Sequence, residues 1–289
     1  CLPYFKKFEN HQCRDTDYTG NEGPVAISNG NNMRNPLYRA FIDAGVEAGY
    51  GETEDYNGFR QEGFGQKFMN VDRGIRASTG YSYLKAAKKR PNLTILKRAL
   101  VTRIVFEGKT ATGIECKIGD KTSVYSAKKE VILSAGAIGS PQLLQVSGVG
   151  PRKILEAAGI DLLHELPGVG ENLQDHLEFN FQYFCKQPIS LNSELGLFKK
   201  GLIGVRWLLF KTGLGRTNHF EACAFIRSKA GVKSPDIQYH FLPGAITYDG
   251  SVAVKGHGFQ VHVGHNKPTS RGHVRAQSGD LSQHPEILF

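Results

Sequence analysis

Apolar residues at helical spacing predict several helices along the chain. After Pro36, apolar positions recur every three or four residues until a pair of glycines ends the pattern. In the segment STGYSYLKAAKKRPN, Ser78 is a candidate N-cap and Pro91 a stop, which predicts a helix over 79–89. Shorter helices are predicted at 139–148, at 151–158 and near 198–210.

Short apolar runs predict strands of two kinds. Between 92 and 127, β-branched runs separated by Gly-Lys and Gly-Asp pairs predict a small meander that starts with NLTIL at 92–96. The run EVILSAG at 130–136 is continuously apolar, which is typical of a strand buried on both faces of a parallel sheet. Later runs alternate polar and apolar residues and predict an antiparallel sheet with one packed and one open face: 178–184, 221–227, 236–242, 259–264 and 272–277.

The change of pattern near residues 175–177 is the predicted domain boundary. It separates residues 1–176, with helices, the meander and the buried run, from residues 177–289, with the alternating strands. The predicted fold class is α/β (α+β), part of a Rossmann-like domain followed by an antiparallel sheet.

Composition places the chain among globular proteins. Hydrophobic residues make up 40% of its 289 residues and charged residues 22%. The longest apolar candidate, GLIGVRWLLF, is too short to span a bilayer and contains Arg206. Because the sequence starts at Cys1 and stops at the apolar Phe289, we expect an internal piece of a longer protein. The odd number of scattered cysteines favours reduced thiols and an intracellular location.

The net charge of +9 leaves a binding-module interpretation open. A basic run near the predicted helix end could meet a nucleic acid or an anionic lipid surface, although a solvated face is the preferred interpretation. Its members are Lys85, Lys88, Lys89, Arg90, Lys97 and Arg98. A metal site is not predicted, because His262 and His265 point to opposite faces of one strand without cysteine or carboxylate help.

The stretch LSAGAIGSPQLLQVSGVG combines a predicted strand end, glycines and a helix start. Such a backbone permits the close approach of a phosphate or a planar cofactor, and the helix N-terminus favours negative charge. Pro141 is expected in the first helical turn, where its missing N–H does no harm. By spacing alone, a plain strand-to-helix turn explains the stretch as well.

The same stretch resembles a signature of the glucose-methanol-choline (GMC) oxidoreductases. The matching positions are Gly136, Ala137, Ser140, Pro141, Leu143, Leu144, Ser147, Gly148 and Gly150. The segments LPGVGENLQDHLE and SRGHVRAQSGDLSQHPEI resemble later blocks of that family, so the resemblance runs through most of the chain. It implies a flavoenzyme that oxidises alcohols by hydride transfer to FAD.

The resemblance also implies which parts of the flavin site are present. Val101 would meet the adenine end of FAD, and Ala135 and Gly136, with Ser140 and Pro141, would lie beside the cofactor. The dinucleotide fingerprint of three glycines is absent, since GVGPRK and GVGENL each hold only two. The catalytic histidine of the family is expected beyond Phe289, so this segment alone should not turn over.

Within the family, segments such as CLPYFKKFE and PDIQYHFLP resemble most the members that oxidise choline. A fixed trimethylammonium group requires a carboxylate and aromatic faces. By resemblance, Glu178 supplies the carboxylate, Phe220 the aromatic face, and His240 orients the hydroxyl. Another primary alcohol or a sugar stays open as substrate. The resemblance also allows peripheral association with the inner membrane, and the sequence leaves the electron acceptor open.

Overall fold

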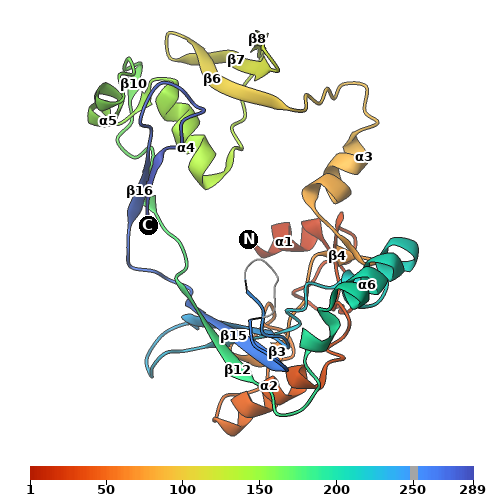
Figure 1. Cartoon of the computed structure of the whole chain (residues 1–289). Helices are drawn as coiled ribbons and strands as arrows, with labels where there is room; N and C mark the ends of the chain where they lie inside the picture. Colours follow the sequence, from red (N-terminus) through yellow and green to blue (C-terminus); the bar gives the residue numbers. More distant parts are fainter. Residues whose placement is uncertain (248–252) are drawn as a thin grey trace. The chain divides into compact units, whose positions relative to one another are not determined.

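The computed structural model describes residues 1–247 and 253–289, which form two compact units (Figure 1). Unit 1 comprises residues 1–93 and 176–267, and unit 2 comprises residues 94–175 and 268–289. The chain therefore passes from one unit to the other at 93/94, 175/176 and 267/268. The domain boundary predicted at 176/177 falls beside the second of these crossings.

Unit 1 contains a five-stranded sheet with helices and short strand pairs around it. The helices are α1 (Leu2–Phe8), α2 (Pro36–Glu47), α3 (Lys85–Ala87) and α6 (Leu197–Phe210), with a π-helical turn at Gly80–Leu84 and 3-10 turns at Leu191–Glu194 and Leu214–Arg216. The strands are β1 (Glu9–His11), β2 (Val25–Ile27), β3 (Gly63–Gln66), β4 (Val71–Asp72), β5 (Ile75–Arg76), β12 (Glu178–Phe184), β13 (Ala222–Ile226), β14 (Ile237–Leu242) and β15 (Gly258–His265).

The central sheet of unit 1 is antiparallel throughout, with strand order β12-β15-β14-β13-β3. Helix α2 packs against β3, β13 and β14, on the lower face of the sheet in Figure 1. Its residues Leu37, Tyr38 and Ile42 form core clusters with the apolar side of the alternating strands. The predicted sheet and the helices after Pro36 and near 198–210 are confirmed. One difference is that β13 is buried on both faces, because Tyr56 covers Phe225 on the side away from α2.

A buried carboxylate ties the loop before α2 to strand β13. Glu221 is 1% exposed, and it accepts hydrogen bonds from the backbone N–H groups of Asn31 (2.9 Å) and Met33 (2.7 Å) and from the Thr217 hydroxyl (2.7 Å). The loop presents these N–H groups together because Gly30, Asn32 and Met33 all have positive φ, a conformation in which successive N–H groups form an anion-binding concavity.

Unit 2 contains a three-stranded meander, two helices and a second small antiparallel sheet. Its strands are β6 (Ala99–Glu107), β7 (Thr110–Ile118), β8 (Lys121–Ser126), β9 (Val149–Gly150), β10 (His164–Glu165), β11 (Glu171–Leu173), β16 (Gly272–Arg275) and β17 (Glu286–Leu288). Its helices are α4 (Gly136–Val146) and α5 (Arg152–Ala157). The meander β6-β7-β8 is confirmed, whereas β16, predicted in the substrate sheet, pairs instead with β11 and β17.

Two predicted strands are wrong. The segment NLTIL is exposed and irregular, since it carries the crossing between the two units at 93/94. EVILSAG is also not a strand, and Ile132 is 78% exposed. An apolar run becomes a strand only where neighbouring strands complete its hydrogen bonds, and EVILSAG pairs with no strand of the described residues. Parallel strand pairs in the described part of the chain are β1 with β2 and β9 with β10, beside an isolated parallel bridge between Glu52 and Phe64.

Helix α4 begins at Gly136, three residues before the predicted helix start at residue 139. Pro141 therefore lies inside the helix, so the prediction of a first-turn proline is wrong. Polar residues at the C-terminal end of α4 hold unit 2 together: Ser147, which follows the last helical residue, accepts the backbone N–H of Ile104 in β6 at 2.8 Å through its Oγ. The fully buried Gln145 donates to the carbonyls of Val169 and Val274 and accepts the N–H of Ala276 at 2.6 Å.

Replacing Gln145 with Leu should destabilise unit 2. The change leaves two buried carbonyls and one buried N–H without partners, which costs about 2 kcal/mol or more. Denaturant unfolding of the full-length protein measures this cost, and Gln12→Leu is a matched control because the Gln12 amide makes only a 3.4 Å bond to Asp72 at the surface. Equal stability of the two variants would contradict the role given to Gln145.

Within the described residues no helix is long and apolar enough to cross a membrane. The five cysteines are all free; Cys116 and Cys223 are buried, whereas Cys1 and Cys13 are exposed. All six members of the basic run between Lys85 and Arg98 are exposed.

Candidate functional site

A row of polar side chains crosses the central sheet of unit 1 on the face opposite α2. Residues directly paired across an antiparallel sheet point to the same side. The register pairs Asn180 with His262, His262 with His240, and His240 with Cys223. Glu178 and Gln260 stand two residues from members of this row on β12 and β15, so they share its face.

Hydrogen bonds link three of these residues into a chain that ends on Glu178. The Gln260 amide Nε2 lies 2.8 Å from His262 Nε2, and His262 Nδ1 lies 2.6 Å from Glu178 Oε1. Gln260 Oε1 accepts the N–H of Ile246 and the amide of Gln182, which leaves Nε2 of Gln260 as the donor. His262 therefore accepts at Nε2 and donates from Nδ1 to the Glu178 carboxylate.

These hydrogen bonds fix the position of the Glu178 carboxylate, which solvent and ligands can reach. Gln260 and His262 are 3% and 7% exposed, whereas the Glu178 side chain is 38% exposed. The second carboxylate oxygen of Glu178 has no hydrogen-bond partner among the described residues. A buried, fully bonded support thus presents an accessible negative charge.

The neighbouring histidine has a different partner. Lys67, the residue after β3, places its Nζ 2.7 Å from Nδ1 of His240. Phe220 packs edge-to-face against both histidines, with ring centroids 6.2 Å from His240 and 5.4 Å from His262. The three residues predicted for the substrate site, Glu178, Phe220 and His240, are therefore brought together on one face.

Burial and charge decide the protonation of this face. Burial, followed by the Lys67 charge, lowers the pKa of His240 to about 4, so His240 is neutral at physiological pH. Burial also lowers the pKa of Lys67, against a smaller opposing effect of Cys223 and Glu178. The pKa of the Cys223 thiol rises to about 12 for the same reason, which keeps this cysteine in the unreactive thiol form.

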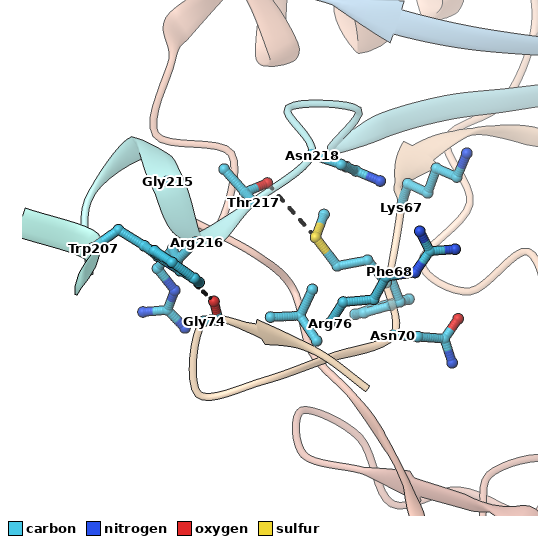
Figure 2. Close-up of a pocket in the computed structure, with 12 residues that line it drawn as sticks. Lys67, Phe68, Asn70, Gly74, Arg76, Trp207, Gly215, Arg216, Thr217 and Asn218 are labelled. Carbon is cyan, nitrogen blue, oxygen red and sulfur yellow. Dashed lines mark hydrogen bonds between the residues drawn. The ribbon is translucent and has the colours of Figure 1, made fainter. Parts of the chain in front are cut away.

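Lys67 also borders a cavity of about 540 Å³ (Figure 2). Within the lining, Trp207 Nε1 donates a hydrogen bond to the Gly74 carbonyl at 2.7 Å. The Thr217 hydroxyl, which donates to Glu221, also lies 3.6 Å from the Met69 sulfur. Figure 2 shows the Lys67 amine and the Asn218 amide at the same end of this cavity, away from Trp207. Lys67 thus belongs both to the cavity wall and to the polar face.

The residues predicted to contact a cofactor lie in unit 2. Val101 in β6 and Ala135 before α4 line one cavity of about 520 Å³. Gly136 has φ +84°, and no heavy atom lies within 4 Å of the position that a Cβ would take. The Ser140 hydroxyl accepts the N–H of Ala135 at 3.1 Å, and Pro141 is the next residue of the helix.

Sequence reasoning missed Lys67, Gln260 and His262. His262 was considered only as a metal ligand, and Lys67 stands outside any predicted strand. The alternation in FQVHVG does place Gln260 and His262 on one strand face. What the sequence lacked was the register that sets His262 between Glu178 and His240, because pairing partners lie tens of residues apart.

A comparison with a protein-family model gives the class of the protein. The sequence model described as GMC oxidoreductase matches residues 1–178, more than half of the 289 residues. The chain therefore belongs to the GMC oxidoreductase family.

Particular relatives are similar over the whole chain. A protein named oxygen-dependent choline dehydrogenase from Photobacterium profundum is 59% identical over 290 residues, and one of the same name from Vibrio vulnificus is 57% identical. Each match covers 100% of this chain but only 51% and 52% of the relatives. The chain thus spans about half the length of these relatives.

Solved structures confirm the fold class. Pyridoxine 4-oxidase from Mesorbium loti matches with a TM-score of 0.82 and 30% identity, covering 99% of this chain and 52% of that one. Formate oxidase of Aspergillus oryzae RIB40 matches with a TM-score of 0.88 and 22% identity, covering 99% and 56%. The second likeness concerns the fold alone.

Proposed function

We propose that this chain is part of an FAD-dependent choline dehydrogenase, which oxidises choline to betaine aldehyde in the synthesis of glycine betaine. Two relatives at 59% and 57% identity carry the name choline dehydrogenase, which supports the substrate. The observation that carries the proposal is the polar face on which Glu178, Phe220 and His240 meet.

This face has the chemistry that choline requires. The trimethylammonium group cannot donate an ordinary hydrogen bond, so its recognition depends on charge and on aromatic contact. Glu178 offers an accessible carboxylate held by His262, and Phe220 adds an aromatic ring beside it. The neutral His240 stands at the other end of the face, where a hydroxyl group can take its hydrogen bond.

The residues of unit 2 fit a flavin cofactor. Bound FAD would supply the hydride acceptor for the alcohol carbon. Val101 and Ala135 would contribute the walls of the 520 Å³ cavity, and the open backbone at Gly136 would permit close approach. Ser140 and Pro141 would act by shaping the start of α4 rather than by direct chemistry. The histidine that takes the hydroxyl proton is assigned, by family resemblance, beyond Phe289.

Other parts of the proposal concern location and partners. An intracellular location, in the cytoplasm or at the inner membrane surface, agrees with the five free cysteines and with bacterial relatives. A nucleic-acid-binding module is the weaker alternative, because the basic run is exposed along a helix end and an irregular segment rather than gathered around aromatic residues. The electron acceptor is left open.

Anaerobic reduction of the flavin in the full-length protein tests this function. Choline should bleach the yellow absorbance of the oxidised flavin, while simple aliphatic alcohols and sugars at equal concentration should bleach it more slowly. Bleaching by those alcohols but not by choline would assign a different substrate. A full-length protein without flavin that binds RNA or anionic vesicles in a salt-dependent manner would favour the binding module.

His262 provides a further prediction for this site. In the His262→Leu variant of the full-length enzyme, Glu178 loses its hydrogen-bond donor, so KM for choline should rise by roughly fivefold, or about 1 kcal/mol. His265→Leu is the matched control, since His265 is exposed and points away from the polar face. Steady-state kinetics decide the matter: an unchanged KM in His262→Leu would show that Glu178 needs no support.

A further inference from the structure

Lys67 makes a contact that its place in the sequence does not explain. It follows β3, its backbone N–H donates to the carbonyl of Glu221 at 2.9 Å, and its side chain turns to the polar face. There Nζ lies 2.7 Å from His240 Nδ1, a distance typical of a strong charge-assisted hydrogen bond.

The direction of this bond decides the tautomer of His240. A lysine amine carries hydrogens in either protonation state, and its ordinary pKa lies well above that of histidine, so the shared proton stays on Lys67. His240 Nδ1 is then the acceptor, and in the neutral ring the remaining hydrogen sits on Nε2. Nε2 has no hydrogen-bond partner among residues 1–247 and 253–289, so this N–H is free to meet a ligand.

We propose that Lys67 is a positioning residue for alcohol oxidation: by donating to His240 Nδ1, it holds His240 as a hydrogen-bond donor toward the oxygen of the bound alcohol. The inference rests on the proposed function as an alcohol oxidoreductase and adds a residue to it. Negative charge develops on that oxygen as its proton leaves, and a donor already oriented toward it stabilises the charge without reorganisation.

Lys67 also makes the charge of the polar face unequal, positive beside His240 and negative beside His262. Lys67 lies beside His240 and Glu178 beside His262, on neighbouring strands. A substrate with a cationic end and a hydroxyl end is therefore favoured in one orientation, with the cation toward Glu178 and the hydroxyl toward His240. The same arrangement disfavours the reverse orientation, because Lys67 would repel the cation.

Kinetics of the full-length holoenzyme test the role of Lys67. In Lys67→Met, kcat should fall by about tenfold or more while KM for choline changes much less, because the loss falls on the transition state. Lys233→Met is the control, since Lys233 is exposed in the connection between β13 and β14. Lys67→Arg keeps a cationic donor and should keep the wild-type pH profile.

The pH profile separates this role from a purely structural one. The groups around His240 are Lys67, Cys223, His262 and Glu178. Without Lys67, a cation no longer opposes protonation of His240, so its pKa should rise from about 4 toward the ordinary value. Imidazolium carries hydrogen on both ring nitrogens, so the kcat of Lys67→Met should be low above this raised pKa and recover as the pH falls through it, whereas the wild type should show no such step in that range.

A readout without turnover keeps the test independent of the substrate. Nitrogen NMR of the oxidised holoenzyme labelled at histidine, with His240 assigned through His240→Gln, reports which ring nitrogen carries hydrogen. The proposal expects hydrogen on Nε2 in the wild type. Hydrogen on Nδ1, or a wild-type kcat and pH profile in Lys67→Met, would overturn it. If Lys67→Met fails to fold, the wild-type spectrum decides. If choline fails to reduce the flavin, only the substrate assignment fails, since the tautomer is measured without substrate.

Discussion

The Glu178→Gln variant of the full-length enzyme should bind choline much more weakly. Glutamine keeps the shape and still accepts the hydrogen bond from His262 Nδ1, so the change removes the charge alone. An ion pair at a partly exposed site with an effective dielectric near 20 amounts to a few kcal/mol. After solvent screening of an exposed carboxylate we expect about 2 kcal/mol, a KM for choline raised roughly thirtyfold.

A neutral isostere of choline provides the control for this variant. In 3,3-dimethylbutan-1-ol a carbon atom replaces the ammonium nitrogen, so the shape is kept and the charge is lost. Glu178→Gln should leave its KM nearly unchanged, and the flavin content should match the wild type. A choline KM that does not move, or an equal rise for both alcohols, would remove Glu178 as the partner of the ammonium group.

The Glu221→Ala variant should be the least stable of the variants considered. Loss of the Glu221 carboxylate removes the acceptor of two backbone N–H groups and of the Thr217 hydroxyl. At a position 1% exposed, this should cost about 3 kcal/mol and lower Tm by roughly 6–12 °C. Glu221→Gln should lie between, since an amide keeps one acceptor but sets an NH₂ group against a backbone donor.

Thermal unfolding of the full-length protein measures this effect. Glu194→Ala is the matched control, because Glu194 pairs with Lys199 at 2.9 Å near the surface. An exposed ion pair of this kind contributes at most about 1 kcal/mol. Equal Tm values for Glu221→Ala and Glu194→Ala would show that the loop before α2 does not depend on the buried carboxylate.

The elements predicted correctly are those whose own sequence carries the full signal. Helix α2 has an amphipathic pattern with a proline start, and Asn35 accepts the N–H of Leu37 at its N-terminus. Strand β12 was predicted from its alternation, although all of its residues are exposed. Strands β13, β14 and β15 were predicted because each has an apolar side that packs toward α2. In these cases local propensity and tertiary packing agree.

The failures concern elements that depend on distant parts of the chain. EVILSAG has the composition of a buried strand, but the described residues offer it no neighbouring strand. Pro141 was placed by its usual position at a helix start, whereas α4 begins earlier, at Gly136. Residues such as Gln145 and Ser147, which the family signature contains or adjoins, serve the packing of unit 2 through bonds to β16 and β6.

In the candidate site, too, some residues could be predicted from the sequence, whereas others depend on distant parts of the chain. Glu178, Phe220 and His240 could be named from resemblance, and the structure brings them onto one face. Their supports could not be named, because Lys67 and His262 act through pairing across strands that are far apart in sequence. His262 holds the Glu178 carboxylate in place through a hydrogen bond, and in our proposal Lys67 sets the tautomer of His240.

We propose that this face selects a cationic alcohol for oxidation. The most direct test is anaerobic stopped-flow reduction of the flavin in the full-length wild-type protein, with choline and 3,3-dimethylbutan-1-ol compared at matched concentrations. We expect choline to bleach the flavin at concentrations where the neutral isostere hardly does. Equal reduction by the two alcohols, or reduction by the isostere alone, would contradict it.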